Sequence, residues 1–414
     1  MINAIRISLA TISLVMACLI SNAQTLASFE VELAKATNGI DVPASISLSE
    51  LKNSPSTSFT LAEIKDNKQV QVPYQINKTD NTISWMIPQN GENRKKHFYQ
   101  LIKSPPGKFN EIIAGDKDGA LTIIADKKNL LRYYHKTVYP PAGIDTNFKR
   151  SAFIHPLWTP HGQELTRIQP GDHYHHYGIW NPWTHTVFEK DTIDFWNIKG
   201  KTGTVRFAKF NSITNGPVYS EFEALHEHVV FKKDGSEKVA LNELQQVRVY
   251  RPGEKSDYYL VDITSTLTCA SASPLLIVTY RYGGFGWRAT EFWDKNNSEM
   301  LTSEGKTRDN TDGTKARWCI IQGSLPGNDS GGAVMMSHPA NYNHPEPLRI
   351  WDKNANGGRG DVFANFAPTK DKDWLLEPGK TYVLKYRLVV FNGKFDAAKA
   401  ESAWQYFAEP AKIK

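Results

Sequence analysis

The sequence is poor in cysteine and has no long apolar segment after its N-terminus. Its 414 residues include three cysteines, and beyond residue 23 no segment approaches the roughly 20 apolar residues that cross a bilayer. Runs of about five or six like charges are also missing. With 40% hydrophobic and 22% charged residues, we expect a globular protein without a membrane span and without a nucleic-acid-binding surface.

Several enzyme signatures are absent as well. The sequence has no Walker loop, no glycine-rich dinucleotide fingerprint after a strand and no nucleophile elbow. Internal repeats and low-complexity tracts are missing too, which disfavours solenoids and propellers. Function therefore has to be argued from less familiar patterns.

The first 23 residues have the pattern of a signal peptide. Arg6 precedes an apolar run, and residues 21–23 form the small-x-small pattern that signal peptidase cleaves. The mature chain is expected to begin at Gln24, in the periplasm or outside the cell. A lipoprotein is the weaker alternative, because Met16 fits a lipid-attachment box poorly and the apolar run continues beyond Cys18.

Removal of this segment leaves a mildly basic chain with two cysteines. One arginine is lost, so 48 basic side chains remain against 43 acidic ones, a net charge of +5. This charge permits anionic substrates without requiring them. Cys269 and Cys319 could form one disulfide in an oxidising compartment or stay as two separate buried thiols.

Alternating apolar and polar residues predict β-strands along nearly the whole mature chain. Short alternating segments fill residues 28–104, and candidates of eight to fourteen residues follow the double proline at Pro140 and Pro141. Strands of that length suit a large two-sheet assembly. Helix signals are nearly absent until Asp396, which can cap a helix over residues 397–408.

We therefore predict an all-β protein with one C-terminal helix. A large antiparallel two-sheet supersandwich is expected over residues 140–414, with a smaller N-terminal β unit over residues 24–139. The two units should share an interface, because long strands need an opposing sheet to bury their inner faces.

Histidines are concentrated in the stretch KRSAFIHPLWTPHGQELTRIQPGDHYHHYGIW. Five of the twelve histidines fall there: His155, His161, His173, His175 and His176. Histidine exchanges protons near neutral pH and is the commonest metal ligand, so such crowding indicates a site. If DHYHHYGIW forms a strand, His173 and His175 share one face with Tyr177. Tyr174 and His176 then point to the other face.

This cluster could also hold a metal, although the sequence requires none. A zinc site would need a third ligand from His155, His161 or Asp172, and none of them has a spacing such as HExxH. The segment HEHVV at residues 226–230 misses that motif by one position. Proton transfer or hydrogen bonding is the favoured role, and purely structural histidines are the alternative.

Aromatic residues surround the histidines. Those within forty residues are Trp158, Tyr174, Tyr177, Trp180, Trp183, Phe195 and Trp196. Flat rings with a polar tip suit the CH faces of sugars, which favours a carbohydrate ligand, whereas ordinary β-sheet core is the alternative. Trp180 and Trp183 are the better sugar candidates, because Asn181 and Pro182 between them suggest a loop.

A second informative stretch is YRYGGFGWRATEFW. It places Arg281, Arg288 and Glu291 around a glycine-rich hinge that can bring the backbone close to a ligand. Arginine offers a fixed fork for a carboxylate, a sulfate or a pair of hydroxyls. Arg288 is therefore predicted in the site, with a surface ion pair as the alternative.

The segments HPLWTPHGQELTR, GDHYHHYGIW, GGFGWR, SHPAN and YRLVVFNG resemble the DUF6807 family, often labelled "methane oxygenase PmoA", over residues 28–394. The resemblance implies a bacterial exported protein associated with sugar catabolism and a fold similar to the galactose-mutarotase-like supersandwich. The family motif marks His155, Thr159, Arg167, Asp172, His173, His175, His176, Gly178, Trp180 and Arg288. Tyr174 and Tyr177 stand where Pro and Arg are expected in many relatives, which leaves a shared substrate open. The oxygenase label conflicts with the lack of transmembrane segments.

We therefore expect an exported carbohydrate-active enzyme, of lyase or hydrolase type, that acts on an oligosaccharide or polysaccharide. One histidine or tyrosine would move the proton while Arg167 or Arg288 holds a negative oxygen. Predicted catalytic residues are His173, His175, His176, His155, Arg167 and Arg288, and predicted substrate-binding residues are Asp172, Tyr174, Tyr177, Trp180, Trp183 and Glu291. The alternatives are a non-catalytic glycan-binding protein and, less favoured, a metal-dependent oxygenase.

Overall fold

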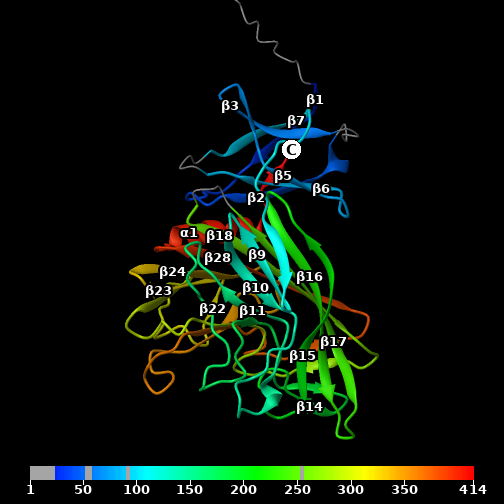
Figure 1. Cartoon of the computed structure of the whole chain (residues 1–414), viewed down its shortest axis with the longest axis vertical. Helices are drawn as coiled ribbons and strands as arrows, with labels where there is room; N and C mark the ends of the chain where they lie inside the picture. Colours follow the sequence, from blue (N-terminus) through cyan, green and yellow to red (C-terminus); the bar gives the residue numbers. More distant parts are fainter. Residues whose placement is uncertain (1–23, 52–57, 90–93, 252–255) are drawn as a thin grey trace, which may run out of the picture.

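Antiparallel sheets arranged in two units make up the protein (Figure 1). The computed structural model describes residues 24–51, 58–89, 94–251 and 256–414. The predicted signal peptide lies outside these residues. Within them no helix is long and apolar enough to cross a membrane.

The smaller unit is a sandwich of two sheets. One has the strand order β29 (Lys412–Ile413), β1 (Thr25–Glu32), β7 (Lys96–Lys103), β3 (Phe59–Lys65) and β4 (Lys68–Gln71), and the other has β2 (Val42–Ser47), β6 (Thr82–Ile87) and β5 (Tyr74–Asn77). A short 3₁₀ turn, η1 (Leu48–Glu50), follows β2. Trp85 and Tyr99 are fully buried between the sheets, with their ring centroids 5.3 Å apart. Because β29 pairs with β1, the last strand of the described chain belongs to the same sheet as the first.

The larger unit is built on a nine-stranded and an eight-stranded sheet. The nine-stranded order is β22 (Lys315–Ala316), β25 (Glu346–Ile350), β26 (Phe363–Phe366), β20 (Phe285–Arg288), β12 (Ile179–Trp180), β11 (Phe153–Leu157), β10 (Lys128–Tyr134), β9 (Ala120–Ala125) and β8 (Ile113–Lys117). The eight-stranded order is β15 (Gly203–Thr214), β16 (Tyr219–Phe231), β17 (Glu237–Tyr250), β18 (Tyr258–Cys269), β28 (Thr381–Asn392), β24 (Asp329–Ser337), β23 (Trp318–Leu325) and β21 (Ser298–Thr302). A four-stranded sheet of β14 (Asp191–Ile193), β13 (Thr186–Phe188), β19 (Leu275–Ile277) and β27 (Trp374–Leu376) and a 3₁₀ turn, η2 (Thr146–Phe148), complete it. The prediction of a two-sheet all-β body with long strands is confirmed.

Strand alternation divides the nine-stranded sheet into a core face and an outer face. Ile179 and Trp287 belong to the large hydrophobic core that these sheets enclose. Their neighbours Trp180 and Phe363 instead form a separate buried cluster. Successive side chains of a strand point to opposite faces, so this second cluster lies on the other side of the sheet. The candidate site is built on that outer face.

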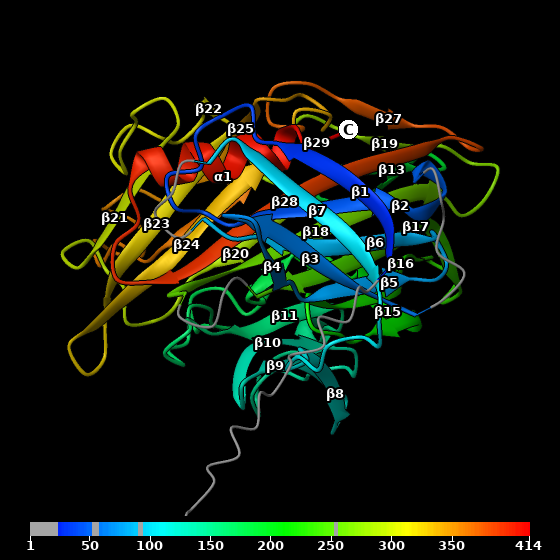
Figure 2. The ribbon, with the colours of Figure 1, turned by 90° about the horizontal axis from the view of Figure 1, so that it is seen from above.

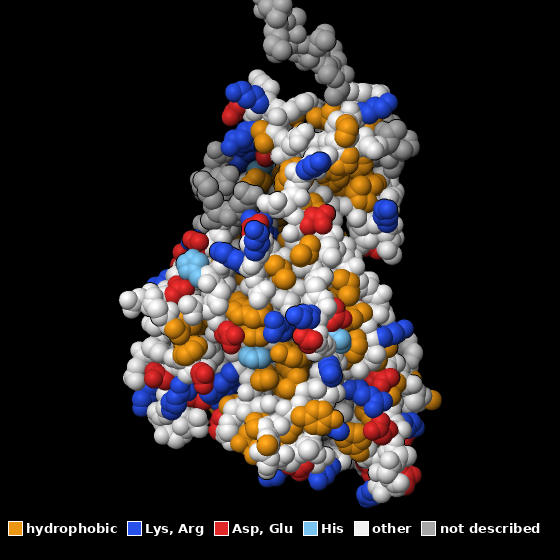
Figure 3. All heavy atoms as spheres, in the orientation of Figure 1, with side chains coloured by type: hydrophobic (Ala, Val, Ile, Leu, Met, Phe, Trp, Pro, Cys, Tyr) orange, Lys and Arg blue, Asp and Glu red, His pale blue; other side chains and the backbone are white. Residues whose placement is uncertain are grey.

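The predicted C-terminal helix is confirmed as α1 (Ala397–Ala408). The Asp396 carboxylate accepts a hydrogen bond from the backbone N–H of Lys399 and so caps its first turn. Ala400 and Phe407 pack into a cluster with residues of β23, β24 and β28, so the helix covers the outside of the eight-stranded sheet. Seen from above, α1 lies beside β29 and β1, where the two units meet (Figure 2). On the face drawn in Figure 3, acidic, basic and apolar side chains are interspersed.

The chain passes from the smaller unit to the larger one between β7 and β8, near residues 103–113. The predicted division at residues 139 and 140 falls between β10 and β11, which pair within the nine-stranded sheet. Strand patterns are alike on both sides of this point, so sequence alone does not mark the change of sheet. Cys269 and Cys319 are both free thiols, and burial raises the pKa of Cys319 to about 12.

Candidate active site

A cavity of about 550 Å³ opens on the outer face of the nine-stranded sheet, within the usual size range of small-molecule sites. Its lining residues are His173, His175, His176, Trp196, Asn197, Arg281, Tyr282, Arg349, Trp351, Asp352, Asn354, Ala355, Asn356 and Phe363. His176, Trp196 and Phe363 are buried and form the floor, whereas Arg281 and Asp352 are exposed at the rim. Three histidines, aromatic rings and amide side chains thus face one space.

The three clustered histidines lie on a turn, and the prediction that they lie on a strand is wrong. Backbone hydrogen bonds from His173 to the carbonyl of Pro170 and from His176 to that of His173, 2.8 and 3.0 Å, fold this segment before β12 begins. Gly178 ends the turn with a φ of +54°, where an added Cβ would lie 2.2 Å from the carbonyl oxygen of Ile154. A turn brings side chains together that a strand would separate.

The turn places all three imidazoles in contact. Ring centroids are 4.7 Å apart for His173 and His176, 4.7 Å for His175 and His176, and 5.3 Å for His173 and His175. Trp351 packs against His173 at 4.8 Å, and Trp180 lies beneath His176 at 5.2 Å. Trp180 therefore supports the floor and is itself only 2% exposed.

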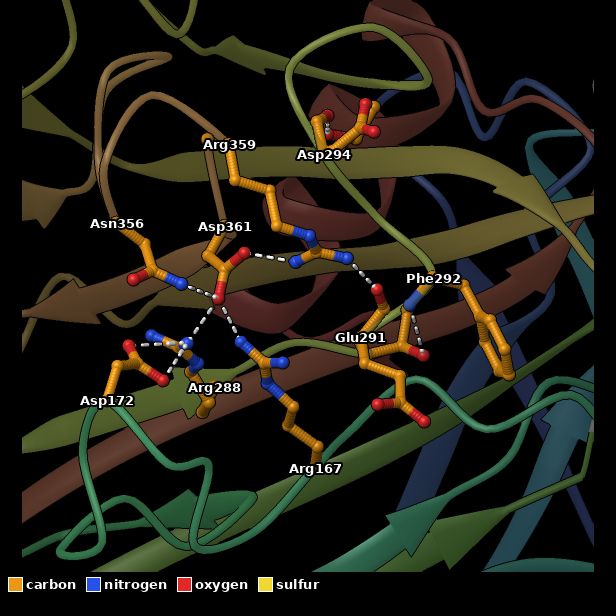
Figure 4. Close-up of polar contacts among 12 residues, drawn as sticks. Arg167, Asp172, Arg288, Glu291, Phe292, Asp294, Asn356, Arg359 and Asp361 are labelled. Carbon is orange, nitrogen blue, oxygen red and sulfur yellow. Dashed lines mark hydrogen bonds and ion pairs between the residues drawn. The ribbon is translucent and has the colours of Figure 1, made fainter.

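A network of charged side chains surrounds the buried Arg288 and Asp361 and is joined to the histidine turn through Asp172 (Figure 4). The Asp361 carboxylate accepts hydrogen bonds from Arg167, Arg288, Arg359 and Asn356. Arg288 also donates to Asp172, at 3.1 and 3.3 Å, and its guanidinium lies 4.5 Å from the centre of the Trp351 ring. Arg288 is completely buried, and its Nε and Nη1 have no hydrogen-bond partner among the described residues. Arg167 and Arg288 are thus held by carboxylates of the protein itself.

Asp172 joins this network to the histidine turn. Its Oδ2 lies 2.7 Å from Nδ1 of His173. Burial favours the neutral acid, but the hydrogen bond with His173 and the charge of Arg288 outweigh it and hold the pKa of Asp172 well below its ordinary value. An ionised carboxylate only accepts hydrogen bonds, so Nδ1 of His173 carries the hydrogen. The side chain of His173 also lines the cavity.

The other two histidines are kept neutral. Burial, followed by the charges of His173, Arg150 and Arg288, lowers the pKa of His175 to about 3. Complete burial, reinforced by the same positive surroundings, also lowers the pKa of His176 well below its ordinary value. The Nδ1 of His176 has no hydrogen-bond partner among the described residues. Burial is thus the main reason that these two imidazoles are neutral, and nearby positive groups add to its effect.

Several predicted site residues lie away from the cavity. His155 sits on β11 with its Nδ1 2.9 Å from the hydroxyl of Thr166, and burial lowers its pKa to about 4. Trp183 lies in the loop expected from the sequence, between β12 and β13, but its side chain is fully buried in the main core, 5.8 Å from the Trp374 ring. The site role predicted for these two side chains finds no support in their positions.

The predicted substrate-binding tyrosines and glutamate are also placed elsewhere. Tyr177 is fully buried, and its hydroxyl donates to the carbonyl of Phe148. Tyr174 packs against the ring of Phe148 at 5.9 Å. Glu291 enters the charge network only through its backbone carbonyl, which accepts a hydrogen bond from Arg359. None of these three side chains is among the residues that line the cavity.

The predicted glycine hinge serves packing between protein segments. Gly286 faces Trp196, and a Cβ added there would lie 2.8 Å from the indole ring. At Gly284, which has a φ of +89°, an added Cβ would lie 3.1 Å from Pro368 and 3.2 Å from the ring of Trp183. The close backbone approach inferred from these glycines therefore exists, but it is made to other parts of the protein.

Sequence reasoning missed the loop between β25 and β26. This loop contributes Trp351, Asp352, Asn354 and Asn356 to the lining and Asp361 to the charge network. Arg308 fixes it by donating to the backbone carbonyls of Trp351, Asp352, Gly360 and Asp361, and the bond to Gly360 is 2.5 Å long. The segment WDKNANGGRGD, with its glycines beside Arg359 and Asp361, was the available signal for a functional loop.

The histidine cluster does not form a metal site in this arrangement. Across the described residues, no group of three or more His, Cys, Asp or Glu side chains is placed to hold a metal ion. A second buried group, His226 and His228 with Glu243, lies between β16 and β17. Asn181 donates to Glu243 at 3.0 Å and so ties β12 to this core group.

Comparison with known proteins gives one family and distant structural similarities. A model described as "Family of unknown function (DUF6807)" matches residues 120–405, and no curated protein matches the sequence. Heparan sulfate lyase HepC from Pedobacter heparinus overlaps 71% of this chain at 11% identity and a TM-score of 0.33, and the overlap covers 38% of the lyase.

Two further solved structures overlap to a similar extent. A GalM/aldose epimerase homologue from C. elegans overlaps 70% of this chain at 9% identity and a TM-score of 0.30, and the overlap covers 99% of that protein. The GH36 α-galactosidase AgaA from Geobacillus stearothermophilus overlaps 69% of this chain at 9% identity and a TM-score of 0.28, and the overlap covers 40% of that enzyme. At such distances the activity has to be argued from this chain's own residues.

Proposed function

Because this chain belongs to DUF6807, a family of unknown function, its activity rests on the cavity, and we propose that it is an exported carbohydrate-active enzyme of lyase type. In this proposal His173 removes a proton from a sugar carbon that a neighbouring carbonyl or carboxyl group has made acidic. Export is supported by the signal-like pattern of the first 23 residues.

The observation that carries the proposal is the pairing of Asp172 with His173 at the cavity wall. A general base needs an orienting partner and a free basic atom directed at the substrate. The 2.7 Å contact with Asp172 fixes the ring of His173 and leaves Nε2 for the substrate. As His173 takes a proton, the ionised Asp172 stabilises the imidazolium that forms.

The carboxylates of the site favour a lyase over a hydrolase. Glycoside hydrolysis commonly uses two carboxyl groups on either side of the scissile bond, one of them protonated. Asp172 and Asp361 are both committed to arginine side chains, and Asp352 is the one carboxylate among the described lining residues. A single histidine base, in contrast, is sufficient to begin an elimination.

The lining also suits a sugar. The half-buried ring of Trp351 offers a flat apolar face above a floor that includes Trp196 and Phe363, and Asn197, Asn354 and Asn356 add amide groups to the lining. Apolar surface combined with a few directed polar groups is the common composition of ligand sites, and aromatic faces complement the CH faces of sugars.

The test is to incubate the mature protein with panels of oligosaccharides and polysaccharides. Turnover is measured as the formation of new double bonds and new chain ends. Replacing His173 with alanine should lower turnover by about 10²–10⁴-fold, the usual contribution of a general base. His161→Ala is the matched control, because His161 is exposed and contacts Asp329 outside the cavity. Sugar binding without turnover on every panel would replace the enzyme by a glycan-binding protein, and normal turnover by His173→Ala would remove the assigned base.

A further inference from the structure

We propose that the substrate carries an anionic group, a carboxylate or a sulfate ester, and that Arg281 binds it; this inference rests on the proposed carbohydrate ligand. Arg281 lines the same cavity as His173. It stands at the beginning of the chain segment that leads into β20, close to the predicted hinge but outside the charge network beside the histidines.

Arg281 is the cavity-lining arginine without a carboxylate partner among the described residues. Its guanidinium lies 5.7 and 5.5 Å from the ring centres of Tyr280 and Tyr282. The Tyr282 hydroxyl donates to Asn197 at 3.1 Å, which ties this aromatic support to another lining residue. Stacking on rings orients a guanidinium without using its N–H groups, so they remain free for an anion.

The other arginines near the cavity already have carboxylate partners. Arg349, which also lines the cavity, donates to Asp312 at 2.7 Å. Arg167 and Arg288 share Asp361, and Arg288 also reaches Asp172. The earlier expectation that Arg167 or Arg288 holds the negative oxygen is therefore better met by Arg281, whose charge is offset by no carboxylate in the described part of the chain.

The charge network beside the histidines has the sign that an anion requires. Three arginines, Arg167, Arg288 and Arg359, meet two carboxylates, those of Asp172 and Asp361, so this network keeps a net positive charge. Positive groups are also among the causes that lower the pKa values of His175 and His176. A concave site of one sign in low-dielectric surroundings concentrates ligands of the opposite sign.

An acidic sugar would also complete the chemistry. In a uronic acid residue the carboxylate stands next to a carbon that carries a hydrogen. When His173 takes that proton, the C–H electron pair forms a carbon–carbon double bond and the bond to the leaving oxygen on the next carbon breaks. The proton then passes from the imidazolium to the leaving oxygen, so the histidine is restored. An arginine on the carboxylate stabilises the negative charge that develops there.

The test compares three probes on four proteins by isothermal titration. The probes are methyl β-glucuronide, glucose 6-sulfate and the neutral methyl β-glucoside, and the proteins are wild type, Arg281→Gln, Arg281→Lys and Arg206→Gln. Arg206 is an exposed arginine that pairs with Glu227 and Glu237 outside the cavity, so its variant controls for loss of a surface charge. Tighter binding of the glucuronide or of the sulfate tells which anion the site prefers.

Wild type should bind one acidic probe at least about tenfold more tightly than the glucoside, because a charge-assisted hydrogen bond accounts for such a factor. Arg281→Gln should lose this preference, Arg281→Lys should keep part of it, and Arg206→Gln should keep all of it. Equal binding of acidic and neutral probes by wild type, no binding of any probe, or an unchanged preference in Arg281→Gln would overturn the inference. His173→Ala should retain the preference while losing turnover, so failure of the catalytic proposal is separable from failure of this one.

Discussion

Replacing Asp361 with asparagine should destabilise the protein more than any other isosteric change in the site. The Asp361 side chain is 1% exposed, and its carboxylate serves Arg288, which is 0% exposed, together with Arg167 and Arg359. Asparagine keeps the shape but removes the charge, which leaves these guanidinium groups with Asp172 as their only counter-charge in the network. Breaking a buried ion pair by removing one partner costs about 3–5 kcal/mol.

A loss of this size is a large part of the stability of a typical protein, about 5–15 kcal/mol. Urea unfolding followed by tryptophan fluorescence measures it as a lower midpoint at an unchanged slope. Glu377→Gln is the control, because Glu377 pairs with Lys380 at an exposed site where the side chains are 46% and 60% accessible. Exposed pairs contribute about 0–1 kcal/mol, so the control should unfold close to wild type.

The stability difference between wild type and Asp361→Asn should also depend on pH in one direction. Burial opposes ionisation of Asp361, but hydrogen bonding to Arg359 and the charges of Arg167 and Arg288 hold its pKa below the ordinary value. A lowered pKa stabilises the folded state above the unfolded-state pKa of about 3.9, and this stabilisation is lost as pH falls through the folded-state pKa. The difference should stay constant between about pH 6 and 8 and narrow below about pH 4. If the free energies of unfolding of wild type and Asp361→Asn differ by less than about 1 kcal/mol at neutral pH, Asp361 is not the centre of the network.

Three further outcomes are expected. Since the pKa of His175 is lowered to about 3, this histidine binds a proton in the unfolded chain but not in the folded one just below about pH 6.5. The urea midpoint of the wild type should therefore fall as the pH drops below this value. In His175→Gln the urea midpoint should fall less steeply with pH. Tyr177→Phe removes the bonds with Phe148 and Gln169 and should cost about 1–3 kcal/mol in urea unfolding without changing probe affinity, which an altered affinity would contradict. Mass spectrometry of the exported protein should find Gln24 as its first residue, and an intact Met1 would contradict the signal peptide.

The stretches of sequence that contribute to the site were predictable from residue types, but which of their side chains line the cavity was not. His173, His175, His176 and Arg281 line the cavity as chemistry-bearing residues of the two singled-out stretches. Tyr177 and Trp183 looked equally suitable, because an aromatic side chain has the same sequence signal in a cleft and in a core. Only the tertiary structure shows that Trp183 lies in the main core and that Tyr177 is enclosed.

Asp361 is the clearest case of a residue that sequence could not assign. It lies 189 positions after Asp172, and both carboxylates reach the same guanidinium of Arg288. Acidic residues in a glycine-rich segment are commonly solvated, and nothing local distinguishes Asp361 from its exposed neighbour Asp352. The pairing arises because β26 and β20 are adjacent strands, which brings Arg288 opposite Phe363 in the sheet register.

The sequence by itself determined the period-two alternation, the long strands of the large body, the capped C-terminal helix and the concentration of histidines, because these depend on neighbours within a few residues. Tertiary structure decided which strands share a sheet, that the histidines lie on a turn, and which arginines remain free for a ligand. Those outcomes depend on contacts between distant segments: Asp361, from the loop between β25 and β26, pairs with both Arg167 and Arg288, and no carboxylate reaches Arg281 among the residues described. Charge at the site is therefore a property of the fold, although each charged residue is visible in the chain.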